Sequence, residues 1–178
     1  MNLPNAITLL RILLVPVFAW LVVTERPVAA SIVFVIAAVS DGIDGFLARL
    51  LRQHTELGAI LDPIADKFLA LTALILLVSA GAMPMWLLGV ALLRDVVVFG
   101  TGVTAKLRRR AIAAEPTRIS KYGTFTLMAS IALGLFARSS ERAEELLPFV
   151  AVLGVVAAEC LLVASVQYGL RWRGLLAR

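Results

Sequence analysis

Apolar residues along this chain gather in long runs that are separated by short polar connections. An α-helix needs roughly 20 apolar residues to cross the hydrocarbon core of a bilayer, and the runs have about this length. The pattern therefore predicts an all-α membrane protein that folds as a single domain over residues 1–178, with six transmembrane helices. The predicted spans are residues 6–24, 28–48, 58–80, 84–106, 120–137 and 146–170.

Local signals support the ends of these spans. Pro27 and Pro84 lie near the starts of predicted helices, where a missing backbone N–H costs little. The stretch SAGAMP, residues 79–84, is typical of a tight turn between the third and fourth spans. The stretch SSERAEELLP, residues 139–148, predicts a short amphipathic connection before the sixth span.

Composition agrees with a membrane protein. Hydrophobic residues make up 61% of the 178 residues and charged residues 16%, against about 45–50% and about 25% in soluble domains. The single cysteine, Cys160, excludes an intrachain disulfide and a cysteine-based zinc site. A net charge of +5 in such a chain is typical of cytoplasmic loops and anionic headgroups rather than of nucleic-acid binding.

Basic residues concentrate in every second predicted connection. The positive-inside rule places these connections and both termini on the cytoplasmic side. It therefore predicts a multi-pass protein whose polar cavity faces the cytoplasm. The basic residues concerned are Arg49, Arg52, His54, Lys106, Arg108, Arg109, Arg110, Arg118, Lys121, Arg171, Arg173 and Arg178.

Four aspartates interrupt this apolar chain. Asp41 and Asp44 are three residues apart, and Asp62 and Asp66 are four apart, so each pair shares one face of its predicted helix. The turn between the two helices makes them antiparallel neighbours, and the carboxylates can converge. Because bare carboxylates at that range repel one another, the cluster predicts a divalent cation site, for Mg²⁺ or Mn²⁺, with room for two ions.

Small residues and an arginine surround the aspartates. Gly45, Ala48 and Gly58 allow a ligand to approach the helix backbone, and the Arg49 guanidinium can bind a phosphate through two hydrogen bonds. Together with a metal they indicate a pyrophosphate site. A helix cap at Ser40–Asp41 explains one aspartate alone, but four ionisable groups near membrane depth are costly and usually functional.

This segment resembles the signature of the CDP-alcohol phosphatidyltransferase family, D-x2-D-G-x2-A-R-x8-G-x3-D-x3-D. The chain matches it at every position: Asp41, Asp44, Gly45, Ala48, Arg49, Gly58, Asp62 and Asp66. The resemblance implies six transmembrane helices in a homodimer. It also implies transfer of a substituted phosphate from a CDP-linked donor to an alcohol, with release of CMP.

The same resemblance implies roles for the matching residues. Asp41, Asp44 and Asp62 correspond to metal ligands. Asp66 corresponds to the general base that deprotonates the acceptor hydroxyl, with a further contact to a second metal ion. Residues implied to bind the CDP donor are Asp41, Gly45, Ala48, Arg49 and Gly58.

The first residues narrow the branch of the family. Asn5, Thr8 and Arg11 form an N-x-x-T-x-x-R pattern, and the third aspartate is followed by Pro63. Both features resemble the branch of phosphatidylglycerolphosphate synthases and cardiolipin synthases. The resemblance implies CDP-diacylglycerol as the donor, with membrane lipids around its acyl chains, although the N-terminal pattern is also explained as a helix start.

The acceptor is predicted from the remaining charged residues. Arg118, Ser120 and Lys121 lie at a predicted helix start, where backbone N–H groups favour anions, and Arg94 lies inside the fourth span. These four residues are the predicted binding site of an anionic glycerol-type acceptor. The Arg94–Asp95 pair resembles the cardiolipin-synthase type. So does Gly123, which stands two residues after Lys121 where phosphatidylglycerolphosphate synthases tend to have a second lysine. They favour phosphatidylglycerol over glycerol 3-phosphate.

Other interpretations stay open. The acceptor can be another alcohol, such as inositol phosphate. The aspartates can instead form the cation site of a transporter, or the chain can be a membrane scaffold. Glu159 and Cys160 receive no role. Trp86, Tyr122, Tyr168 and Trp172 lie near predicted span ends, as aromatic residues at membrane interfaces do.

Overall fold

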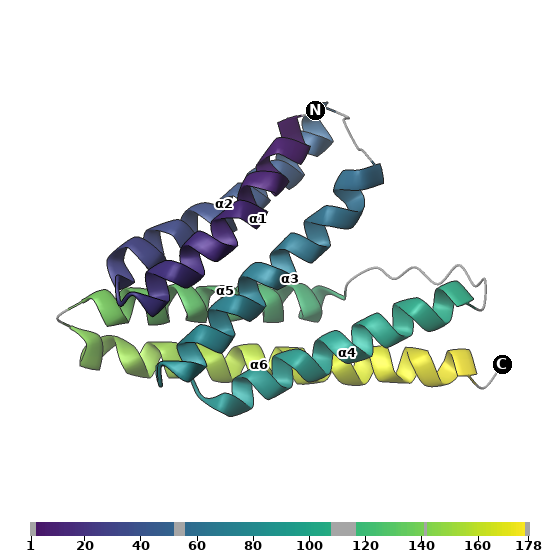
Figure 1. Ribbon diagram of the computed structural model, residues 1–178. Helices are drawn as coiled ribbons and strands as arrows, with labels where there is room; N and C mark the ends of the chain where they lie inside the picture. Colours follow the sequence, from purple (N-terminus) through teal and green to yellow (C-terminus); the bar gives the residue numbers. More distant parts are fainter. Residues whose placement is uncertain (1–2, 52–55, 108–116, 141, 177–178) are drawn as a thin grey trace. The chain divides into compact units, whose positions relative to one another are not determined.

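The computed structural model describes the backbone of residues 3–51, 56–107, 117–140 and 142–176, and the side chains of 9–40, 65, 67–105, 117–140 and 142–173. All regular secondary structure in these residues is helical (Figure 1). The helices are α1 (Leu3–Val23), α2 (Pro27–Leu51), α3 (Glu56–Ser79), α4 (Met85–Leu107), α5 (Arg118–Ser139) and α6 (Ala143–Leu176).

The helix boundaries confirm most of the predicted ones within a few residues. α2 begins at Pro27, and α4 begins directly after Pro84. The turn between α3 and α4 depends on Gly81, whose φ of +69° is a conformation that only glycine adopts without strain. The predicted connection at residues 139–148 was wrong in part, because α6 already begins at Ala143. Acidic residues in its first turn, Glu144 and Glu145, favour a helix start there.

The contacts of the chain divide into two compact units, and each is described by itself. The first comprises residues 1–83 and 131–147. Within it α1 contacts both α2 and α3, and α1 and α2 run side by side in opposite directions (Figure 1). The Phe18 and Phe34 rings meet with their centroids 5.7 Å apart.

The second unit comprises residues 84–130 and 148–178. Small residues let its helices approach closely. A Cβ atom at Gly123 of α5 would lie 3.1 Å from the Cys160 Cβ of α6, and Gly100 of α4 lies against the Trp172 ring of α6. The Ser130 hydroxyl donates a hydrogen bond of 3.0 Å to the Val150 carbonyl. Small residues at helix interfaces are typical of packing inside membranes.

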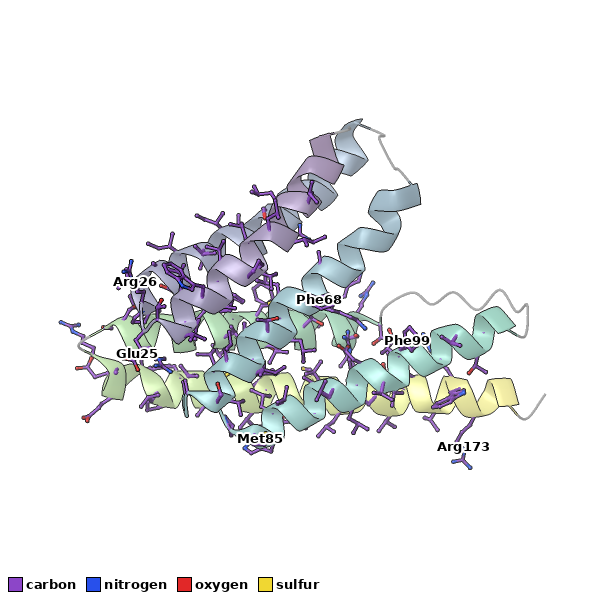
Figure 2. All side chains as sticks on the ribbon, in the orientation of Figure 1. Glu25, Arg26, Phe68, Met85, Phe99 and Arg173 are labelled. Atoms are coloured by element: carbon purple, nitrogen blue, oxygen red, sulfur yellow. The ribbon has the colours of Figure 1, made fainter. Side chains whose placement is uncertain are left out.

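Three helices in the described part of the chain are long and apolar enough to cross a membrane: Met85–Ala105, Arg118–Ser139 and Ala143–Arg173. The described parts of α1, α2 and α3 are apolar as well but shorter. Large apolar side chains project from these helices, such as Met85 and Phe99, the latter 70% exposed (Figure 2). Because such exposure is unfavourable in water, these surfaces indicate an integral membrane protein. Six spans and a single domain stay predictions.

Candidate functional site

Two of the four aspartates lie at the C-terminal part of α2. The side chains of these two residues, Asp41 and Asp44, lie outside the described residues. The same holds for the surroundings of the signature residues Gly45, Ala48, Arg49 and Gly58. The positions of the two aspartates on the helix are nevertheless defined. Ala30, Phe34 and Ala37 are fully or almost fully buried and form one stripe along α2. Steps of three and four residues continue this stripe to positions 41 and 44.

The other pair occupies an equivalent place on α3. Ala65, Leu69 and Ala73 are buried and form a stripe along that helix. Position 62 lies three residues before Ala65, and position 66 lies three residues before Leu69, so both are at helical spacing from this stripe. Since α2 contacts α3, and α1 contacts both, the two helices that carry the four aspartates belong to one packed helix group. The convergence of the four carboxylates stays a prediction.

A charged residue of α1 lies in the same group. Arg11 is fully buried and interacts with other groups of the protein. It precedes Phe18 by seven residues, and position 41 follows Phe34 by seven. Because α1 and α2 are antiparallel and the two rings touch, both positions lie about 10 Å beyond that contact, at the same level. A buried guanidinium is tolerated only beside acceptors or opposite charge. The sequence indicated Arg11 only as part of a branch pattern.

The donor set suits a hard divalent cation. Carboxylate oxygens are the ligands that Mg²⁺ and Mn²⁺ prefer, and the signature contains two pairs of aspartates, one on each of two contacting helices. Among the side chains that the structure describes, no group of three His, Cys, Asp or Glu residues could hold a metal ion. The four aspartates are not among those side chains, so the metal site stays a prediction.

The second unit contains a polar cluster around Arg94 of α4. Arg94 Nη1 donates to Asp95 Oδ1 at 2.7 Å, and Nη2 donates to Ser120 Oγ at 2.7 Å and Thr124 Oγ1 at 3.3 Å. The guanidinium therefore joins α4 to the first two turns of α5. Its Nε–H is buried without a hydrogen-bond partner in the described part of the chain.

The start of α5 is capped by Thr117, whose hydroxyl accepts a hydrogen bond of 3.2 Å from the Ser120 N–H. The backbone N–H of Thr117 donates to the Tyr168 hydroxyl of α6 at 3.2 Å. Tyr168, which the sequence placed near the end of a predicted span, is buried. Its contact joins residues 51 positions apart, which no local pattern indicates.

The four predicted acceptor residues divide into two pairs. Arg94 and Ser120 bind each other, and Ser120 is fully buried. Arg118 and Lys121 are exposed and lie three residues apart on one face of α5. The first turn of α5 contains no acidic residue. Two cations at a helix N-terminus oppose the helix dipole, and a bound anion would compensate both the dipole and the side-chain charges.

Comparison with known proteins agrees with the signature on α2 and α3. A profile of the CDP-alcohol phosphatidyltransferase family matches residues 1–166. This chain belongs to that family. The family predicted from the aspartate signature is therefore confirmed, and the match extends over helices α1 to α5 and most of α6.

Individual relatives of this CDP-alcohol phosphatidyltransferase bear the name "CDP-diacylglycerol--glycerol-3-phosphate 3-phosphatidyltransferase". The protein of Cereibacter sphaeroides is 36% identical over 148 residues, which are 80% of this chain and 67% of the relative. The protein of Pseudomonas fluorescens is 51% identical over 82 residues, 44% of this chain and 42% of the relative. That of Escherichia coli K12 is 49% identical over 78 residues, 42% and 43% of the two chains. The last two matches thus span less than half of the relatives' length.

The hydrogen bonds of Arg94 lead to a prediction about stability. Arg94→Lys keeps the positive charge, but a lysine ammonium lacks the planar fork that reaches Asp95, Ser120 and Thr124 together. We expect the free energy of unfolding to fall by about 1–3 kcal/mol. Thermal unfolding of the detergent-solubilised protein, followed by tryptophan fluorescence, measures this loss. Arg173→Lys, at an exposed site on α6, is the control; equal melting of both variants would contradict the prediction.

Proposed function

We propose that this protein transfers the phosphatidyl group of CDP-diacylglycerol to glycerol 3-phosphate and releases CMP. The observation that carries the proposal is the family match over residues 1–166, with every signature residue present between Asp41 and Asp66. The names of the three relatives specify this donor and this acceptor. They favour glycerol 3-phosphate over the phosphatidylglycerol that the residues of α4 and α5 suggested.

The proposed reaction is one substitution at phosphorus. The acceptor hydroxyl oxygen attacks the phosphorus that carries diacylglycerol, and a new P–O bond forms. The bond from this phosphorus to the bridging oxygen breaks, so that CMP leaves. Asp66 takes the proton of the acceptor hydroxyl, because a carboxylate beside the reacting atoms is a suitable base. Such transfers depend mainly on positioning and on neutralising phosphate charge.

The signature residues supply the donor side of the proposal. Asp41, Asp44 and Asp62, with Asp66 at a second ion, would hold one or two Mg²⁺ or Mn²⁺ ions. When bound, these ions neutralise charge on the phosphate oxygens. Arg49 would bind the pyrophosphate through its planar fork. The three small residues of the signature would let the nucleotide approach the backbone: Gly45, Ala48 and Gly58.

The acceptor side of the proposal assigns different tasks to the two pairs. Arg118 and Lys121 are exposed at the start of α5 and would bind the phosphate of glycerol 3-phosphate. Arg94 and Ser120 are bound to each other and would hold that helix start in place. The Nε–H of Arg94, which has no hydrogen-bond partner among the described residues, would be a donor for a direct contact with the acceptor.

The membrane topology belongs to the same proposal. All six helices have 21 residues or more, enough to cross a hydrocarbon core of about 30 Å. We propose six spans with both termini and the active site on the cytoplasmic side, supported by the basic residues between α4 and α5 and after α6. A homodimer remains part of the proposal through the family resemblance.

An acceptor panel tests the function. Purified protein in lipid nanodiscs receives labelled CDP-diacylglycerol, Mg²⁺ or Mn²⁺, and one of glycerol 3-phosphate, phosphatidylglycerol or inositol phosphate. We expect CMP release and lipid product with glycerol 3-phosphate, and none when the metal is chelated. Cardiolipin as the main product would overturn the proposed acceptor. Cation flux without CMP release would favour the transporter.

The role of Asp66 gives a second prediction. Asp66→Asn removes the proton acceptor but keeps the side-chain size, so we expect kcat to fall by about 100-fold or more. Binding of CDP-diacylglycerol should remain close to that of the unaltered protein. Glu159→Gln, at an exposed carboxylate of α6, is the control and should keep full activity. An active Asp66→Asn protein would falsify the assignment of the base.

Lys121 gives a third prediction, on substrate affinity. Lys121→Ala removes a charged hydrogen-bond donor from the proposed phosphate site, and the KM for glycerol 3-phosphate should rise about tenfold or more. The KM for CDP-diacylglycerol should change little. Arg173→Ala removes an exposed charge of the same sign from α6 and serves as the control. A larger change in the donor KM than in the acceptor KM would reject this site.

A further inference from the structure

The first turn of α5 is attached to both neighbouring helices of the second unit. On the α4 side, Arg94 binds the hydroxyls of Ser120 and Thr124. On the α6 side, the Tyr168 hydroxyl accepts the N–H of Thr117, the residue that caps the helix. The two attachments act on opposite ends of the same short stretch, one on side-chain hydroxyls and one on the backbone.

The hydrogen bond from the Thr117 N–H to the Tyr168 hydroxyl constrains the backbone at the start of α5. Tyr168 as a whole is 4% exposed, so little of it meets water that could compete for the hydrogen bond with Thr117. The N–H groups of a first helical turn have no partner within the helix and depend on caps and outside acceptors. Without the phenol oxygen, the backbone N–H of Thr117 loses its partner, and the helix start can fray.

The same turn carries the two exposed cations. Arg118 follows Thr117 directly, and Lys121 lies next to Ser120, so both side chains start from backbone that the two attachments hold. An anion that binds both cations needs their separation and direction to be fixed beforehand. Binding otherwise includes the cost of ordering the turn.

We propose that Tyr168 is a positioning residue of the acceptor site: its hydroxyl holds the Thr117 backbone, and this fixes Arg118 and Lys121 for a phosphate-bearing alcohol. The inference rests on the proposed function for the identity of the acceptor. It assigns a task in substrate binding to a residue of α6 that lies outside the aspartate signature. Tyr168 acts through Thr117 and does not touch the acceptor.

Tyr168→Phe tests the inference, because it removes one oxygen atom and keeps the buried ring. The Arg171 guanidinium, which lies 5.6 Å from the Tyr168 ring centroid, keeps an aromatic neighbour. We expect the KM for glycerol 3-phosphate to rise about threefold to tenfold, as the loss of one hydrogen bond predicts. The kcat and the KM for CDP-diacylglycerol should stay near their original values. Tyr122→Phe, at a tyrosine that is 64% exposed, is the matched control.

Hydrogen–deuterium exchange of the protein in nanodiscs, without substrates, provides a second measurement. Peptides that cover residues 117–124 should exchange faster in Tyr168→Phe than in the unaltered protein or in Tyr122→Phe. Unchanged exchange in this segment would overturn the inference. So would an unchanged acceptor KM, an equal rise in both KM values, or a lower melting temperature as the only effect, since the last indicates packing alone.

The two measurements separate this inference from the proposed function. If the unaltered protein does not use glycerol 3-phosphate, the proposed function fails. The KM is then measured for the alcohol that the panel identifies, and the exchange experiment is unaffected. If the unaltered protein uses glycerol 3-phosphate and Tyr168→Phe matches it in both measurements, only the inference about Tyr168 fails.

Discussion

Ionised side chains between apolar helices are costly unless opposite charges or hydrogen bonds surround them. This constraint determines where the polar residues of the protein lie. In the first unit, fully buried Arg11 lies at the level of position 41 on the adjoining helix. In the second unit, Arg94 binds a carboxylate and two hydroxyls. Half-buried Arg94 is thus placed where the fold also brings oxygen atoms.

The same constraint connects structure with function in this CDP-alcohol phosphatidyltransferase. In the proposed function, a phosphate-bearing substrate and a divalent cation would bring opposite charges to the polar residues of these helices. The carboxylates of the four signature aspartates on α2 and α3 suit the cation. Arg118 and Lys121, at a helix start without acidic residues, suit an anion. The proposed cation-binding and anion-binding residues thus lie on different helices.

Close packing of the helices fixes the positions of the polar groups in the second unit to within a few ångströms. Gly123 and Gly100 bring α5 and α4 against side chains of α6. A hydrogen bond of ordinary length can then cross from Tyr168 to the backbone of Thr117. Larger residues at the glycine positions would move the helices apart, and contacts of this length would be lost. The residues without chemical function therefore set the geometry for those that have one.

The sequence by itself determined the helices, their approximate ends and the family. These depend on local properties: apolar runs, Pro27, Gly81 and the regular spacing from Asp41 to Asp66. It placed Arg94 and Ser120 in one candidate site but did not show that they bind each other, nor that Arg11 is buried. Only the tertiary structure decided these features and the contact of Tyr168 with Thr117. Arg94 and Ser120 are 26 positions apart and Thr117 and Tyr168 are 51 apart, and the burial of Arg11 depends on packing between different helices. Such contacts depend on which helix faces pack together, and local sequence patterns do not specify that choice.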